Sequence, residues 1–292
     1  MDYLQFDKLP ELRKPTFVAA FRGWSDAGEA ATLAIRHLVE GWSAEEFAQI
    51  DPEEFFDFTV ARPTIRITEE GQRGLEWPSN TFYYHRREDA DEDVVLFLGT
   101  EPHLKWRAFT GAIRDLFERL GGVRLVTIGA LVGATTHTRP PPITGFATEE
   151  DLRGRLEAMT ITRTRYEGPT GIVGTLHDAF RRAGHSAASA WVALPPYLGS
   201  ATNPRGALAL LETLDRLFAF APNLSMLARA SQRFEKQVDD ALENSPEMRQ
   251  YLQEMEKRID SGIVEAATPD IGPPSDLIGD LEAYLRDQRK GG

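Results

Sequence analysis

The sequence predicts an α/β fold, a three-layer α/β/α sandwich on a mostly parallel sheet, followed by an α-helical C-terminal extension. Over the first two thirds of the chain, almost continuously apolar runs alternate with helical patterns. Such runs are typical of parallel strands that are buried between two layers of helices. After Pro204 only helical patterns follow. The 292 residues, 41% hydrophobic and 27% charged, are those of a globular protein that can bury its own core.

The first βα unit comes near the N-terminus. Residues 16–21 form a short apolar run that predicts a buried strand. Residues 27–40 carry apolar side chains at helical spacing and predict a helix. Asp26 precedes this helix, and its short side chain can accept the free N–H groups of the first turn.

The same alternation continues to residue 194. We expect buried strands at 94–99, 123–131 and 187–194, and helices at 106–120, 149–159 and 172–183. Residues 55–60, 64–68 and 81–85 read as shorter strands, separated by Gly-containing turns, that extend the sheet in an antiparallel way. The acidic stretch 88–93 predicts a solvated turn.

The last third is helical. Residues 206–220, 224–243 and 246–259 predict three helices, and 276–289 predict a fourth, capped by Ser275 after a Pro/Gly linker at 268–274. We therefore divide the chain into a sandwich domain, 1–221, and a helical extension, 222–292. Because helices with narrow apolar stripes bury little by themselves, the extension should pack on the body or on another subunit.

Composition excludes several classes of function. A net charge of −12 makes nucleic acid and anionic membranes poor partners. No apolar run approaches the ~20 residues of a spanning helix, and no signal peptide is visible, so we expect a cytoplasmic protein. The absence of cysteine excludes disulfides and thiolate chemistry. Residues 45–57 hold six acids and no base, which indicates either a solvated face or an acidic surface for a basic partner.

Ligands of open α/β sheets bind beyond the carboxyl ends of the strands, so the loops there supply the candidate residues. The glycine spacing after the first strand matches neither a P-loop nor a dinucleotide fingerprint. Glu101, His103, His137 and Arg139 can form an acid/base and anion-binding set, or each can satisfy loop backbone. With no G-x-S-x-G and no H-E-x-x-H motif, we name no catalytic residue, no metal site and no cofactor. The candidates for a cleft or partner-binding surface are Gly23, Trp24, Asp26, Gly28, Arg62, Glu101, Trp106, His137, Arg139, Thr170, Tyr197 and Asn203.

An ordered set of loop motifs resembles one known family. The motifs are Phe21-Arg22-Gly23-Trp24-Ser25-Asp26-Ala27-Gly28, Arg62-Pro63, Glu76-Trp77-Pro78, Gly99-Thr100-Glu101-Pro102, Trp106, His137-Thr138-Arg139-Pro140, Gly168-Pro169-Thr170-Gly171, Pro196-Tyr197 and Asn203-Pro204. Over about residues 10–220 the chain resembles the proteasome assembly chaperone family, in particular the prokaryotic relatives of its second eukaryotic member. The helical tail is similar to the extension of actinobacterial members.

The resemblance implies a phosphorylase/hydrolase-like sandwich and a role in assembling the proteasome core particle by holding α-type subunits. Some relatives dock through a C-terminal hydrophobic–Tyr–any motif. This chain ends in Asp287-Gln288-Arg289-Lys290-Gly291-Gly292, and its nearest match, Ala283-Tyr284-Leu285, is not terminal. The resemblance therefore does not extend to that docking mode.

Two hypotheses of function follow. The first is a non-enzymatic, chaperone-like scaffold that binds proteasome subunits or another protein complex, as a homo-oligomer for which a trimer is one option. The second is a small-molecule binder or enzyme acting on an anionic or nucleoside-like ligand in the strand-end cleft. There Arg139 would hold the anion, Glu101 would act as acid/base or ribose acceptor, and Trp24 or Tyr197 would stack. A packed strand-end surface would contradict this second hypothesis.

Overall fold

The computed structural model describes residues 3–67, 71–163, 166–198, 200–243 and 245–261. They form an α/β fold whose eight-stranded mixed sheet runs in the order β1-β3-β6-β7-β2-β8-β10-β9. In that order the strands are β1 (Leu4–Gln5), β3 (Glu45–Ile50), β6 (Thr81–His85), β7 (Val94–Thr100), β2 (Thr16–Arg22), β8 (Arg124–Val132), β10 (Ser186–Leu194) and β9 (Ile143–Ala147).

The centre of the sheet is parallel and its flanks are antiparallel. β7, β2, β8 and β10 pair in parallel, as the continuous apolar runs predict. β6 joins β7, β3 joins β6, and β9 joins β10 with antiparallel pairing. The α/β sandwich predicted from the sequence is therefore confirmed, with the parallel character concentrated in the strands that carry the candidate loops.

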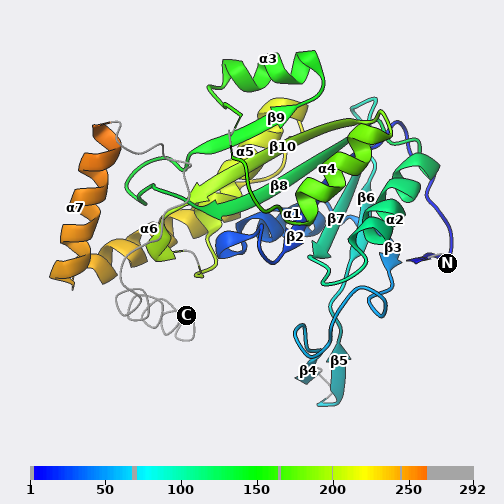
Figure 1. The fold of residues 1–292 in the computed structure, drawn as a ribbon, viewed down its shortest axis with the longest axis horizontal. Helices are drawn as coiled ribbons and strands as arrows, with labels where there is room; N and C mark the ends of the chain where they lie inside the picture. The colour runs from blue at the N-terminus through cyan, green and yellow to red at the C-terminus, as the bar shows by residue number, and fades with distance from the viewer. Residues whose placement is uncertain (1–2, 68–70, 164–165, 199, 244, 262–292) are drawn as a thin grey trace.

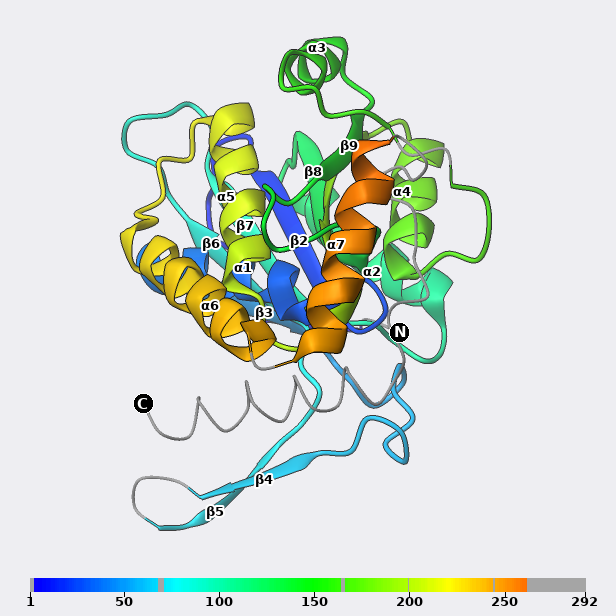
Figure 2. The ribbon, with the colours of Figure 1, turned by 90° about the vertical axis from the view of Figure 1, so that its left-hand side faces the viewer.

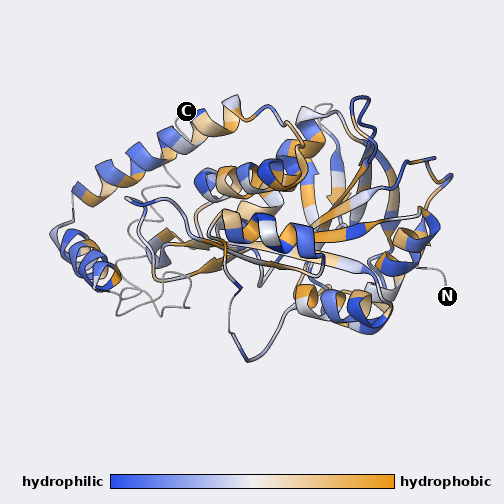
Figure 3. Ribbon diagram, turned by 90° about the horizontal axis from the view of Figure 1, so that it is seen from above, coloured by the Kyte–Doolittle hydropathy of each residue, from blue (hydrophilic) through white to orange (hydrophobic). Residues whose placement is uncertain are grey.

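Helices cover both faces of the sheet (Figure 2). α1 (Ala30–Gly41) and α5 (Pro204–Phe218) pack on one face, and α2 (Trp106–Arg119) and α4 (Ile172–Arg182) pack on the other. Because successive side chains of a strand point to opposite faces of the sheet, β2 contributes to the cores on both faces. Val18 and Ala20 face α1, whereas Phe17 and Phe21 face α2. The helices in Figure 3 carry both hydrophilic and hydrophobic residues, as helices with one face on a core require.

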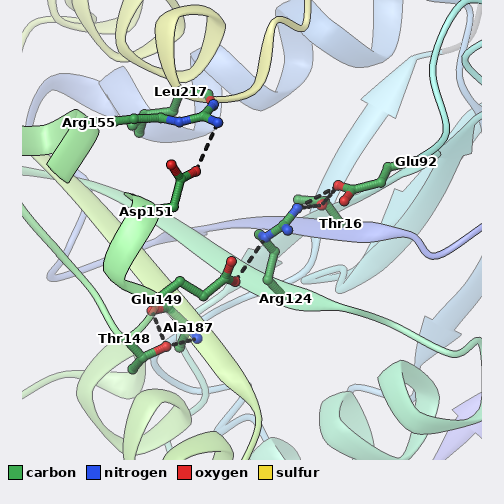
Figure 4. A network of polar contacts seen from close by, with 9 residues as sticks. All are labelled: Thr16, Glu92, Arg124, Thr148, Glu149, Asp151, Arg155, Ala187 and Leu217. Carbon is green, nitrogen blue, oxygen red and sulfur yellow. Dashed lines mark hydrogen bonds and ion pairs between the residues drawn. The ribbon is translucent and has the colours of Figure 1, made fainter. Parts of the chain in front are cut away.

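Polar contacts tie the amino ends of the strands together. The guanidinium of Arg124, at the start of β8, contacts Glu92 at 2.5 Å and Glu149 at 3.1 Å (Figure 4). Glu149 directly precedes α3 (Glu150–Ala158), which packs beside β9. Asp93 is buried and accepts hydrogen bonds from Arg13. The expectation of a solvated turn at 88–93 is therefore wrong for Asp93, whose buried carboxylate is held by Arg13 and the Arg87 backbone N–H.

The segment between β3 and β6 is the main departure from the predicted elements. Residues 55–60 form turns and not a strand. β4 (Thr64–Ile67) lies within the predicted 64–68, but it pairs only with β5 (Arg73–Glu76) in a separate two-stranded sheet and does not extend the main sheet. We call this β4–β5 unit the hairpin. It projects away from the rest of the molecule in Figures 1 and 2. β3, β5 and β9 were not predicted.

The helical extension packs on the body of its own chain. α6 (Ser225–Glu243) and α7 (Pro246–Asp260) lie close to their predicted ranges. Leu227 joins the main core, whereas Phe234, Val238 and Met248 form a small cluster with Tyr197. The predicted linker at 268–274 and helix at 276–289 lie outside the described residues. In the part of the chain that the structure describes, no helix is long and apolar enough to cross a membrane.

Candidate functional site

Glu101 joins three segments at the carboxyl end of the sheet. It follows β7, and its backbone N–H donates to the Arg22 carbonyl oxygen at 2.8 Å. Its carboxylate accepts a hydrogen bond from the Trp24 N–H at 3.3 Å and from the Ile172 N–H, in the first turn of α4, at 2.7 Å. A carboxylate is favoured there because the first N–H groups of a helix lack intrahelical partners. Glu101 therefore positions the loop after β2 against the start of α4.

Two glycines leave room for this carboxylate. Gly23 has a φ of +127°, and a Cβ there would lie 3.1 Å from the Glu101 Cβ. At Gly171 a Cβ would lie 2.7 Å from Glu101 Oε1 and 3.0 Å from Trp24 Cε3. A side chain at either position would push the carboxylate or the indole ring aside. Thus Gly23, Trp24 and Glu101, three of the predicted residues, form one constellation with Gly171.

Three large side chains in the loops after β2, after β7 and before α4 are exposed to solvent. Trp24 is 63% exposed, and Leu104 and Tyr166 are each 52% exposed. The Tyr166 hydroxyl donates to the Pro169 carbonyl oxygen at 3.0 Å, which holds that ring over the loop before α4. We call Trp24, Leu104 and Tyr166 the strand-end face. Trp24 is the only one of the three among the predicted candidates, since a single apolar residue in a loop gives no periodic signal.

Other predicted residues lie near this face with different roles. Trp106 donates from Nε1 to the Pro102 carbonyl oxygen at 2.6 Å and packs against the core under α2, so it supports the loop. Arg62 is exposed at the base of the hairpin. Thr170 is exposed just before α4.

A second constellation is centred on His137, in the loop after β8. His137 Nε2 lies 3.0 Å from Asp239 Oδ1 of α6, and Nδ1 lies 2.7 Å from the Tyr197 hydroxyl. The same hydroxyl accepts from the His137 backbone N–H at 3.0 Å. The network assigns the Nε2–H tautomer, with Tyr197 donating to Nδ1. Burial lowers the pKa of His137, and Asp239 opposes that shift in part.

Helices α6 and α7 cover this loop. Arg139 forms an ion pair with Asp260 at 2.7 Å, and Thr138 donates to Glu256 at 2.6 Å. Arg205 of α5 pairs with Glu235 and donates to the carbonyl oxygens of the same loop. The cavity beside His137 and Arg139 has a volume of about 10 Å³, room for at most one water. His137, Arg139 and Tyr197 therefore act as a packed joint.

Asp26, Gly28 and Asn203 shape the backbone between these constellations. Asp26 Oδ1 accepts from the N–H groups of Ala31 and Thr32, as predicted for a cap of this helix. A Cβ at Gly28, where φ is +57°, would meet the Ala201 carbonyl oxygen at 2.9 Å. Asn203 caps α5 through Gly206 N–H at 2.9 Å. Each of these residues has a local structural task.

The geometry separates the expected acid/base and anion-binding set. Glu101 is bonded to backbone N–H groups, His137 to Tyr197 and Asp239, and Arg139 to Asp260. His103 accepts from the Asp57 N–H at 3.0 Å and holds the base of the hairpin. Glu101 and His103 thus satisfy loop backbone, as the structural alternative expects. The side chains of His137 and Arg139 instead contact side chains of Tyr197, α6 and α7. The packing beside His137 speaks against a ligand cleft there.

Comparison with known proteins agrees with this architecture. The family model described as PAC2 family matches residues 20–242. A PAC2 family protein from Streptomyces avermitilis has 37% sequence identity and a TM-score of 0.74, over 82% of this chain and 99% of that chain. The Mycobacterium tuberculosis proteasome-assembly chaperone homologue has 34% identity and a TM-score of 0.72, over 81% of this chain and 99% of its own.

A Pyrococcus furiosus archaeal proteasome activator shares the fold at 19% identity, with a TM-score of 0.66 over 81% of this chain and 97% of that one. None of the curated proteins matches the chain. The resemblance read from the loop motifs is confirmed, including its actinobacterial relatives. Because the family model spans most of the chain and two solved relatives exceed 30% identity, the chain belongs to the PAC2 family.

Proposed function

We propose that this protein is a non-enzymatic, chaperone-like binding protein that holds a subunit of the proteasome, or of another protein complex, on its strand-end face. The exposure of Trp24, Leu104 and Tyr166 around a rigid support carries the proposal. Large aromatic and aliphatic anchors on a preorganised surface are typical of protein interfaces, where a few such residues dominate the binding energy.

Hydrogen bonds within the chain hold the loops that carry this face. Glu101 fixes the backbone at Trp24 and Ile172, and Leu104 N–H donates to the Phe55 carbonyl oxygen at 3.1 Å. Because these contacts hold the loops without a partner, little ordering free energy is lost on binding. The proteasome subunit as occupant is supported by the 34% identical Mycobacterium tuberculosis relative, which is a proteasome-assembly chaperone homologue.

The test is native mass spectrometry and calorimetry of the full chain mixed with the proteasome α and β subunits of its own organism. Trp24→Ser should weaken a complex about 30-fold, the effect of losing one interface anchor. Met226→Ser is the matched control, since Met226 is 64% exposed but lies on α6, away from the strand-end face. A complex with neither α nor β subunits, or equal losses in both variants, would contradict the proposal.

A further inference from the structure

The hairpin presents one apolar face to solvent. Ile65 pairs with Leu75 and Ile67 pairs with Arg73 in the β4–β5 register, so these side chains share a face. Ile65, Ile67 and Leu75 are 58%, 74% and 58% exposed. The other face is polar and carries the Arg66–Glu76 ion pair at 3.0 Å.

Such a hairpin requires a covering surface. A two-stranded sheet is marginal in water without packing on a further element. The hairpin projects from the body in both ribbon views (Figures 1 and 2), and its three aliphatic side chains remain exposed. An apolar face of this kind therefore indicates an interaction between molecules.

The same chain carries an open groove at the far edge of its sheet. β1 pairs with β3 only at Leu4–Ile50 and Gln5–Gln49, after which the chain turns away from β3. Between residues 6–11 and the outer edge of residues 45–48 lies a groove of about 830 Å³. Among the residues that the structure describes, no strand pairs with residues 45–48 on that side. The groove thus borders an unpaired strand edge, a surface that accepts an added β-element.

Groove and hairpin are complementary in charge. The lining of the groove is mostly polar, and Phe6, Leu9 and Phe47 are among its residues. Its acidic residues outnumber its basic ones: the acids are Asp7, Glu11, Glu45 and Glu46, and the bases are Lys8 and Arg86. The apolar face of the hairpin carries one charged side chain, Arg73. The charges of Arg66 and Glu76, on the other face, neutralise each other in an ion pair.

One chain does not bring its own hairpin to its own groove. The base of the hairpin is held beside the carboxyl end of β7, through the Asp57–His103 contact. β3 runs in the same direction as β7, because both are antiparallel to β6. Glu45 and Glu46 therefore lie toward the opposite end of the sheet, and the hairpin points away from them (Figures 1 and 2).

We propose that the hairpin of one copy docks in the groove at the β3 edge of a second copy. This contact joins two different surfaces, so it is heterologous and repeats around a closed ring when the rotation allows. The residues of this contact, on the hairpin and in the groove, are not those of the strand-end face, Trp24, Leu104 and Tyr166. The inference does not depend on which partner that face binds.

Two charge reversals test the contact, one on the hairpin and one in the groove. Arg73→Glu places an acid against the acidic groove, and Glu46→Arg places a base where Arg73 would dock. Each should weaken self-association about 30-fold, measured by analytical ultracentrifugation of the full chain. Arg181→Glu on α4 and Glu40→Arg on α1 are the matched controls, because both residues are exposed and lie on other elements. Circular dichroism of all four variants establishes that they are folded.

Mixing the two variants is the decisive experiment. The native hairpin of the Glu46→Arg chain can dock in the native groove of the Arg73→Glu chain, and in the other contact the two reversed charges are again opposite. The mixture should therefore form hetero-oligomers that contain both chains, although each variant alone associates weakly. Native mass spectrometry distinguishes the two chains by mass. A monomeric native protein, an unchanged oligomer in either variant, or two variants that remain monomeric on mixing would each overturn the proposal. If Trp24→Ser loses partner binding but keeps the native oligomer, partner binding and self-association use different surfaces, as proposed.

Discussion

The carboxylate of Asp26 is buried against the first turn of α1. Burial raises its pKa, although hydrogen bonds from Thr32 and Ala31 oppose that shift. Because the folded-state pKa is the higher one, the native protein loses stability as pH rises from about 4, the ordinary value for Asp, through the raised pKa. Asp26→Asn keeps an oxygen for the Ala31 and Thr32 N–H groups and removes the buried charge.

We therefore expect Asp26→Asn to gain free energy of unfolding relative to the native protein as pH rises from 4 to 7, measured by urea unfolding. Asp26→Ala, which removes the cap, should be less stable by about 1 kcal/mol. A difference between native protein and Asp26→Asn that does not change with pH would show that the carboxylate is not desolvated.

His177 gives the opposite dependence on pH. It lies on α4, with Nε2 2.7 Å from the Thr127 hydroxyl, and burial lowers its pKa to about 4. The unfolded chain takes up a proton near pH 6.5, so the native protein loses stability as pH falls from 6.5 toward 4, by up to about 3 kcal/mol.

His177→Gln should remove this loss while retaining a partner for Thr127. Thermal unfolding from pH 7 to pH 4 should then show a flatter profile for the variant, and the two proteins should differ little in slope above pH 7. An equally steep fall in both would exclude His177 as its source.

Single residues were the easier part of the site to predict. Gly23, Trp24 and Glu101 follow buried strands, and the rule that strand ends meet at one edge brought them together. The bond from Glu101 to the start of α4 was not predictable, because it depends on how α4 approaches β7. Arg139 and His137 read as ligand groups for a similar reason: their partners on α6 and α7 lie more than 100 positions away in the chain.

At the scale of elements, α6 is joined to the body through Tyr197. Tyr197→Phe leaves the His137 backbone N–H and Nδ1 without their partner, which should lower the free energy of unfolding by about 1–3 kcal/mol. Amide hydrogen exchange in α6 should accelerate in parallel. Tyr166→Phe, which removes an exposed hydroxyl, is the control, with an expected change below about 0.5 kcal/mol. Equal effects in both variants would contradict a joint at Tyr197.

Periodicity explains which elements were predictable. The apolar runs of β2, β7, β8 and β10 are long and buried on both faces, so each is visible alone. β3 reads as an acidic stretch because its first residues lie beyond the short β1 and have exposed side chains. In the hairpin, Ile65, Ile67 and Leu75 alternate with polar residues, yet the pattern does not reveal that β4 and β5 form a separate sheet in which these side chains are exposed.

At the scale of the whole molecule, a ring assembled through the hairpin would present several strand-end faces to one partner complex. Linked sites bind a multivalent target about 10²–10⁴-fold more tightly than one site does. Arg73→Glu should therefore leave the affinity for a single partner subunit unchanged in calorimetry, since Trp24, Leu104 and Tyr166 are untouched. Its apparent affinity for an assembled ring of the same subunits, measured by biolayer interferometry, should fall by about 10²-fold or more. Trp24→Ser should instead reduce both affinities. Equal losses for single subunits and rings in Arg73→Glu would mean that the hairpin contacts the partner directly, and self-association would then not be its role.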